Sequence, residues 1–217
     1  MLRHLYHGSE AIIEKPVYGA GKAHNDYGPG FYCTNSRKLA KEWATRLHGA
    51  GFVNEYSLRD DRFSVLDLTK PPYDDVLHWI ALLMENRRLA QDLRQNYPRE
   101  LDFLRSNYLL DISAYDTVIG YRADDAYFKF PESFVRSEIT LESLRKIYLA
   151  GDLGKQYVLV SQRAFNALRF LGYEEVSSVE RDSYYSRVSA AGRLHQDLRS
   201  QDRYASGTRL IDLVRDK

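Results

Sequence analysis

The sequence contains a single cysteine, Cys33, among its 217 residues. One thiol cannot form a disulfide within the chain and cannot supply a cysteine cluster for structural zinc, so both kinds of framework are excluded. No run approaches the roughly 20 apolar residues that a transmembrane helix needs. Residues 1–4 lack the apolar region of a signal peptide. We therefore expect a soluble, cytoplasmic protein without membrane contact.

Charge of one sign is not in excess either. The chain has 31 basic and 30 acidic residues, which gives a formal net charge of +1. This balance provides no overall attraction to nucleic acid or to a membrane, although it is compatible with a local basic groove. With 44% hydrophobic and 28% charged residues, the length suits one globular domain with an insertion or a tail.

Several common catalytic signatures are missing. The sequence has no GxxxxGK[ST] phosphate loop, no GxGxxG dinucleotide turn and no GxSxG nucleophile elbow. Its histidines lack the i, i+4 spacing of a zinc-binding helix, so we expect no metal. Cys33 is flanked by aromatic residues and is better explained as a strand residue than as a nucleophile. Metal-dependent and classical hydrolase activities are therefore disfavoured.

Two short motifs near the start of the chain are the most informative stretches. The first is the apolar run that ends in His7, Gly8 and Ser9, which predicts a strand whose glycine lets a ligand approach the backbone. The second is the glycine turn 28–30, which leads into an aromatic strand over 31–34 and then a helix over 36–48.

Together these motifs resemble the ADP-ribosyltransferases of the diphtheria-toxin and poly(ADP-ribose) polymerase branch, whose signature is His-Tyr-Glu. Within it they are similar to a bacterial family of uncharacterised transferase-like domains linked to toxin–antitoxin loci. The resemblance covers roughly residues 1–172. It implies an α+β fold with a split, antiparallel or mixed sheet flanked by helices, and it implies NAD as co-substrate.

The resemblance also assigns roles to residues of the first two motifs. His7 matches the histidine that bonds the adenosine ribose, and Gly8 and Ser9 continue the strand end that clamps NAD. Tyr32 matches the tyrosine that stacks on nicotinamide. Trp43 stands eleven residues later, at the spacing of a second aromatic, but its helical position equally suits a core tryptophan.

The third motif of the branch is a strand that opens with Glu-Tyr, and the matching strand here, 155–161, has Gln156 in place of the glutamate. Glutamine accepts a hydrogen bond but carries no charge, so we expect weak NAD hydrolysis and transfer of single ADP-ribose units. Asp124, Asp125 or Glu55 could supply the missing charge. Asp124 could instead cap the turn or helix that follows it.

The loop 19–26 is polar and rich in glycine, and we expect it to arch over the ligand cleft. Lys22, His24 and Asp26 either touch phosphates or the substrate, or are ordinary side chains of a solvated loop.

Hydrophobic periodicity predicts the remaining elements. Residues 1–173 form the transferase-like domain and 174–217 a polar, helical extension, either packed on the domain or free to bind a partner. Helices over 74–110 form an insertion, with a second, short helix after Pro98. The other expected elements are strands over 2–7, 51–58, 63–68, 116–121 and 173–179, with the second and third joined as a meander, and helices over 140–150 and 164–171.

The resulting hypothesis is a mono-ADP-ribosyltransferase that uses NAD to modify a protein, RNA or DNA, and that acts as a bacterial toxin with an antitoxin partner. The alternative is a catalytically inactive NAD- or nucleotide-binding or protein-interaction module on the same scaffold.

Overall fold

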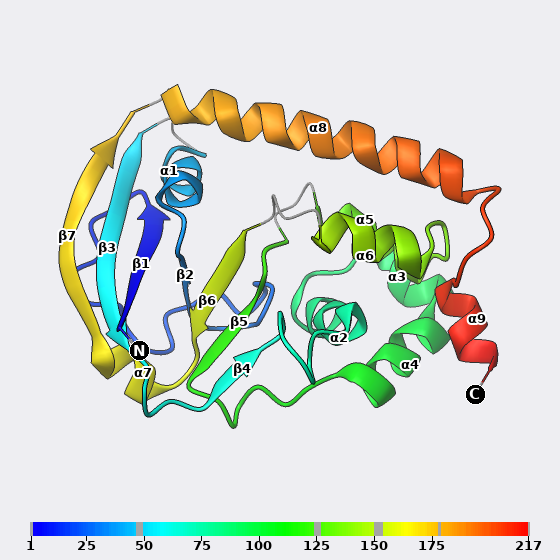
Figure 1. Ribbon diagram of the computed structural model, residues 1–217, viewed down its shortest axis with the longest axis horizontal. Coiled ribbons are helices and arrows are strands. Elements are labelled where there is room, and N and C mark those ends of the chain that lie inside the picture. Colours follow the sequence, from blue (N-terminus) through cyan, green and yellow to red (C-terminus); the bar gives the residue numbers. More distant parts are fainter. Residues whose placement is uncertain (1, 47–49, 124–126, 150–153, 178, 217) are drawn as a thin grey trace.

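The computed structural model describes residues 2–46, 50–123, 127–149, 154–177 and 179–216. These residues form an α+β protein with a seven-stranded sheet in the order β4-β5-β6-β2-β1-β3-β7 (Figure 1), which confirms the expected fold class. The strands are β1 (Leu2–Ser9), β2 (Phe31–Thr34), β3 (Gly51–Arg59), β4 (Val65–Asp67), β5 (Thr117–Tyr121), β6 (Lys155–Leu159) and β7 (Leu168–Val176).

The sheet is mixed and is split between β1 and β2. β4 and β5 are parallel, whereas every other neighbouring pair is antiparallel. β1 pairs with β3 along its whole length, but it pairs with β2 only at Tyr6 and Thr34. The split therefore leaves two groups of strands, β7-β3-β1 and β2-β6-β5-β4, which Figure 1 shows diverging.

Alternation along the strands gives the sheet two buried faces. On β2 and β6, the side chains of Tyr32 and Val158 belong to the large core that packs against the helices, whereas Phe31, Cys33 and Tyr157 belong to a second cluster on the opposite side. Burial raises the pKa of the Cys33 thiol, so this thiol stays protonated.

Helices cover both faces. They are α1 (Arg37–Thr45), α2 (Val76–Asn86), α3 (Gln91–Asn96), α4 (Pro98–Tyr108), α5 (Lys129–Val135), α6 (Leu141–Leu149), α7 (Gln162–Ala167), α8 (Val179–Asp202) and α9 (Leu210–Arg215). Ser36 caps the N-terminus of α1, because its side chain accepts a hydrogen bond from the Leu39 amide. Among the described helices, none is long and apolar enough to cross a bilayer.

The helical insertion has three helices where two were predicted. Asp75 is the N-cap of α2, and its side chain accepts a hydrogen bond from the Leu77 amide. The helix ends at Asn86, because Arg87 adopts an extended conformation. Pro98 then begins α4, where its missing N–H costs nothing because the first helical turn has no acceptor for it. The apolar spacing across 74–96 is regular, so it did not reveal the break between α2 and α3.

The predicted meander is wrong. β3 pairs with β1 and β7, whereas β4 lies at the far edge of the sheet, parallel to β5. Alternation of apolar residues identifies a strand and its buried face, but it carries no information on which strand lies beside it.

The helix predicted over 164–171 is also partly wrong, because α7 ends at Ala167 and Leu168 begins β7. Apolar residues at 165, 168 and 171 mimic a helical period. β7 instead pairs with β3 along its length, and a register shift leaves Leu171 as the extra residue of a β-bulge. The strand expected over 173–179 therefore begins earlier and ends at Val176.

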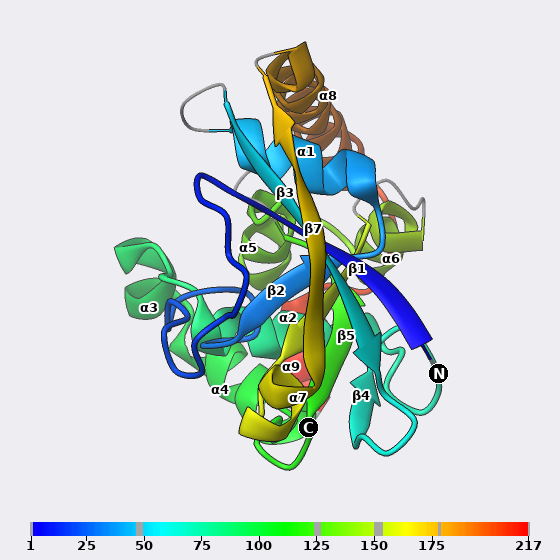
Figure 2. The same ribbon diagram turned by 90° about the vertical axis from the view of Figure 1, so that its left-hand side faces the viewer.

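The C-terminal extension packs on the domain, as α8 runs across α1 and then along α5 (Figures 1 and 2). The buried Glu42 of α1 forms an ion pair of 2.8 Å with Arg187. At the far end of α8, the buried Asp202 accepts hydrogen bonds from the Thr140 amide and the Ser143 hydroxyl at the start of α6.

Candidate functional site

A cavity of about 730 Å³ opens at the split in the sheet. β1, β2 and β6 line it together with α1 and the loop that precedes β2. The predicted site residues that the structure describes all contribute to its wall, although they are far apart in the sequence: His7, Gly8, Ser9, Tyr32, Trp43 and Gln156.

His7 bridges the split through its side chain. Its Nδ1 lies 2.6 Å from the backbone carbonyl oxygen of Tyr32. Because a carbonyl only accepts, Nδ1 must carry the hydrogen, which makes Nε2 the acceptor atom of the neutral ring. Burial lowers the pKa of His7, so the ring is neutral at pH 7 and offers an acceptor to a ligand.

The Tyr32 hydroxyl is fixed by the glycine turn that precedes it. It donates to the Gly28 carbonyl oxygen at 2.6 Å and accepts from the Tyr27 amide at 3.0 Å. Gly28 has a φ of +70°, a conformation that favours glycine. Burial raises the pKa of the Tyr32 hydroxyl, so Tyr32 presents a neutral aromatic wall to the cavity.

Trp43 also lines the cavity, but its ring has a cationic neighbour. The Arg122 guanidinium carbon lies 4.5 Å from the centre of the Trp43 ring, within cation–π range. Among the described residues, Tyr32 and Trp43 make no ring contact with each other. The two aromatics therefore belong to one cavity wall without stacking on each other.

Gly8 allows β1 to pack closely against α1. A Cβ atom at this position would lie 1.9 Å from the Ala40 carbonyl oxygen and 2.7 Å from the Ala44 amide nitrogen. The packing of β1 against α1 thus requires glycine at this position, while the approach of a ligand to the Gly8 backbone stays a prediction. Gly8 positions the helix that carries Trp43.

Gln156 is buried, and its amide points at Asp26. Its Nε2 donates to Oδ2 of Asp26 at 2.8 Å, and the same oxygen accepts from the Ala123 amide at 2.9 Å. The other oxygen, Oδ1, lies 3.2 Å from Nη1 of Arg87. Since a carboxylate only accepts, the orientation of the Gln156 amide is defined, and its Oε1 is the acceptor that can meet a ligand.

Asp26 is the site residue that sequence reasoning undervalued. It is buried, with 4% of its surface exposed, and burial raises its pKa against the opposing effect of Arg87. The expectation of an ordinary side chain on a solvated loop is wrong for Asp26, because the loop 19–26 turns this residue inward, next to Gln156. Lys22 also lines the cavity, whereas His24 contacts the Asn86 carbonyl oxygen and does not.

Of the three predicted sources of the missing negative charge, Glu55 alone lies in the described part of the chain. Asp124 and Asp125 are outside the described residues. Glu55 lies 3.5 Å from His4 and does not line the cavity. Among the described residues, Asp26 is the carboxylate that lies beside Gln156.

Among the described residues of the cavity wall, basic side chains outnumber acidic ones. The basic ones are Lys15, Lys22, Arg46, Arg87 and Arg122, and the acidic ones are Glu10 and Asp26. A partly enclosed site with this excess attracts an anionic ligand. Within the described ranges, no group of side chains has the arrangement of a metal site.

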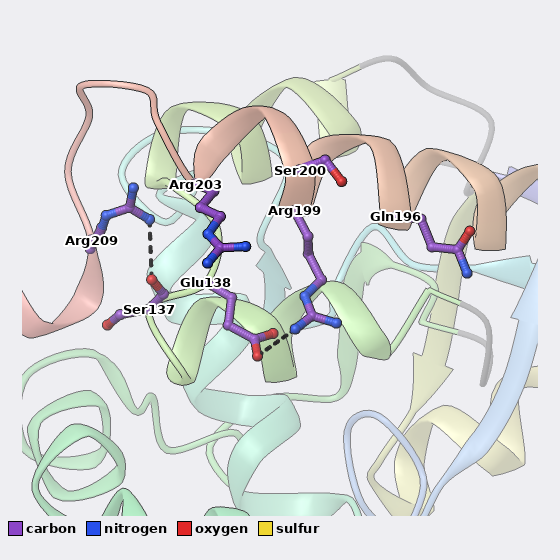
Figure 3. Close-up of a pocket in the computed structure, with 7 residues that line it drawn as sticks. All are labelled: Ser137, Glu138, Gln196, Arg199, Ser200, Arg203 and Arg209. Carbon is purple, nitrogen blue, oxygen red and sulfur yellow. Dashed lines mark hydrogen bonds and ion pairs between the residues drawn. The ribbon is translucent and has the colours of Figure 1, made fainter.

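A second hollow, of about 610 Å³, lies between the end of α8 and the turn from α5 to α6 (Figure 3). Its arginines hold the extension in place: Arg199 donates to Glu138 at 2.7 Å, and Arg209 donates to the Ser137 carbonyl oxygen at 3.1 Å. None of the predicted site residues lines it, so we assign it to the packing of the extension.

Comparison with protein-family models matched residues 3–170 to the family described as "Protein of unknown function (DUF3990)". Comparison with curated proteins gave no match, and neither did comparison with solved structures. The matched segment includes β1, β2, α1 and β6, and with them the whole wall of the cavity. The chain therefore belongs to the DUF3990 family.

Proposed function

We propose that this protein is a mono-ADP-ribosyltransferase that binds NAD in the cavity at the split of the sheet. One observation carries the proposal. Three separate sequence motifs each place one residue in the wall of the same cavity. These residues are His7 on β1, Tyr32 on β2 and Gln156 on β6, and the three strands are neighbours in the sheet. Their convergence is the arrangement that the sequence resemblance requires.

The size and the polarity of the cavity suit a dinucleotide. A volume of about 730 Å³ is within the usual range of small-molecule sites, roughly 300–1,000 Å³. The excess of lysine and arginine suits the pyrophosphate, because guanidinium groups bind phosphate through paired hydrogen bonds. His7 Nε2 and Gln156 Oε1 are both acceptors and suit ribose hydroxyl groups.

NAD supplies the ADP-ribosyl group and, in nicotinamide, a leaving group. The nicotinamide–ribose bond breaks with its electron pair going to nicotinamide, and the acceptor forms the new bond to the ribose and loses a proton. Positive charge develops at the ribose, so a nearby negative charge lowers the barrier. Gln156 contributes only its amide dipole, and the negative charge beside it belongs to Asp26.

A non-catalytic nucleotide-binding module is the second candidate, and one observation favours it. Gln156 is neutral, and the carboxylate of Asp26 is already paired with Arg87 at 3.2 Å. A carboxylate neutralised in this way exerts a weaker field on the ribose than a free one. Such a protein would bind NAD and release no nicotinamide.

Titration with NAD tests the site. We expect His7→Ala to weaken NAD affinity about three- to tenfold, the value of one net hydrogen bond. His4→Ala is the matched control, because His4 lies on the same strand with its side chain 58% exposed. Calorimetry measures the affinity, and circular dichroism checks that both variants fold. Equal affinity of both variants and the parent would contradict the cavity assignment.

Incubation with labelled NAD and cell extract separates the two candidates. A transferase leaves label on a macromolecule and releases nicotinamide, whereas a binding module does neither.

We further propose that the protein acts in the cytoplasm as a toxin whose partner is an antitoxin protein. The basis is the sequence resemblance alone. Expression of the parent chain should arrest growth, and expression of His7→Ala to the same level should not. Growth arrest by both chains would mean that toxicity does not depend on the NAD site.

A further inference from the structure

We infer that a second basic site, next to the cavity, holds the sugar-phosphate backbone of a single-stranded nucleic acid, which is the acceptor. The site is the hollow lined by Arg59, Arg62, Arg163 and Arg169 around Phe63, here named the arginine hollow. This inference rests on the proposed function, because it names the acceptor of that reaction.

The arginine hollow is assembled from four segments. Arg59 ends β3, Arg62 belongs to the turn toward β4, Arg163 lies on α7, and Arg169 lies near the start of β7. The hollow has a volume of about 690 Å³, and Asp61 is the one acidic residue among the described residues of its wall. A chain with a net charge of only +1 thus concentrates positive charge at one end of its sheet.

Two guanidinium groups of this hollow, those of Arg62 and Arg169, are available to a ligand. All four arginines are exposed. Arg163 lies 3.5 Å from Asp116 and 5.2 Å from the centre of the Phe63 ring. Arg62 and Arg169 make no ion pair with any residue in the described part of the chain. Exposed guanidinium groups without a carboxylate partner suit phosphate oxygens, which match their planar fork.

The position of α7 connects the arginine hollow to the NAD cavity. Phe165 of α7 lines the cavity, while Arg163 and Asn166 of the same helix line the hollow. A helix with its side chains is about 10–12 Å across. A polymer bound in the hollow therefore needs to cross only this one helix to bring one of its units to the mouth of the cavity.

A nucleic acid fits this geometry better than a protein does, because its backbone repeats one negative charge at every unit. A single strand fits better than a duplex, because a nucleotide must leave the base stack before an enclosed site can act on it, and a single strand avoids that cost.

Binding of short single-stranded RNA and DNA oligonucleotides, measured by fluorescence anisotropy without NAD, tests the inference. The test variant is Arg62→Gln with Arg169→Gln. The matched control is Arg94→Gln with Arg99→Gln, two exposed arginines of α3 and α4 that also lack ion pairs within the described residues.

We expect the parent to bind and the test variant to bind at least about tenfold more weakly. Each lost phosphate contact to a single strand should reduce the slope of log K against log salt by about 0.7, so the slope should fall by about 1.4 between roughly 50 and 200 mM salt. The control should stay within about twofold of the parent, because its arginines lie outside the hollow. No binding by the parent, or equal losses in the test and control variants, would overturn the inference. Equal affinity of the parent for polyglutamate would also overturn it.

Failure of this inference can be told apart from failure of the proposed function. Nicotinamide release from NAD by the parent chain needs no oligonucleotide. Nicotinamide release without oligonucleotide binding would contradict only the inference that the acceptor is a nucleic acid. Oligonucleotide binding without NAD binding would contradict the proposed transferase activity.

Discussion

The side-chain amide of Gln156 donates a 2.8 Å hydrogen bond to the buried carboxylate of Asp26. Two residues that are far apart in the sequence thus act as one polar unit at the base of the cavity. The unit couples a neutral acceptor, which would meet the ribose of NAD in the proposed reaction, to a negative charge held behind it. Substitutions that test this unit should therefore change Gln156 and Asp26 together.

We expect Gln156→Glu alone to give no gain in nicotinamide release, because two adjacent carboxylates raise the pKa of one of them. Adding Asp26→Asn restores one carboxylate and its hydrogen bond, with the charge now on β6. That double variant should release nicotinamide roughly five- to tenfold faster than the parent, because bonds to charged groups exceed neutral ones by about 1 kcal/mol.

Gln156→Ala is the reference for this pair and should turn over more slowly than the parent while keeping much of its NAD affinity. If Gln156→Ala is as active as the parent, then Gln156 has no part in the reaction.

Gly8→Ala should destabilise the fold by about 1–3 kcal/mol, the usual cost of overpacking a tight contact. The new methyl group would meet the backbone of α1 at 1.9 Å. Gly192→Ala is the matched change, because nothing lies within 4 Å of a Cβ at that helical position. It should stabilise the protein by about 0.5–1 kcal/mol. Urea unfolding measures both, and equal effects would contradict the packing argument.

Arg187→Ala should cost about 3 kcal/mol, because it leaves the Glu42 carboxylate, 3% exposed, buried without its partner. The double variant Glu42→Gln/Arg187→Ala should lose less than Arg187→Ala alone. Arg105→Ala is the surface control: its partner Glu85 is 43% exposed, and the loss should stay below about 1 kcal/mol. A loss for Arg187→Ala no larger than for Arg105→Ala would mean that α8 is weakly docked.

Stability should fall as the pH drops below about 6.5, the ordinary pKa of histidine. Burial lowers the pKa of both His7 and His195, so the unfolded chain binds these protons first on acidification. Their contribution is complete above about pH 6.5 and is lost as the pH falls toward the lowered values. Asp26 acts in the opposite sense, because its pKa is raised and protonation favours the fold.

The variant His7→Gln/His195→Gln isolates the histidine contribution. Its unfolding free energy should depend less on pH between about 7.5 and 5.5 than that of the parent. An unchanged pH dependence would mean that these histidines are not buried neutral groups.

Much of the cavity wall could be predicted from local motifs, and the resemblance that these motifs carry implied the fold class. His7, Gly8 and Tyr32 lie in short motifs where a glycine, an aromatic residue and a strand end coincide within a few residues. Such motifs carry their own structural signal, so they can be recognised without knowing the rest of the fold.

The remaining features depend on contacts between distant segments. The inward turn of Asp26 is set by its partners Arg87, Ala123 and Gln156, all far along the chain. The pairing of β4 with β5, and the strand at 168–171, likewise depend on neighbours that a local window of sequence does not contain. The same holds for the arginine hollow, which four separate segments assemble.

The lone thiol of Cys33 gives this protein an internal probe of its own opening. Cys33 is fully enclosed in β2, one residue from Tyr32, and the chain has no other cysteine to compete for a reagent. A thiol reagent can react only when β2 opens locally, so the labelling rate measures the free energy of that opening at the edge of the cavity. A molecule that binds across the split, and only when β2 is closed, slows the labelling in proportion to its occupancy. The labelling rate of Cys33 can therefore be used to screen for the natural ligand.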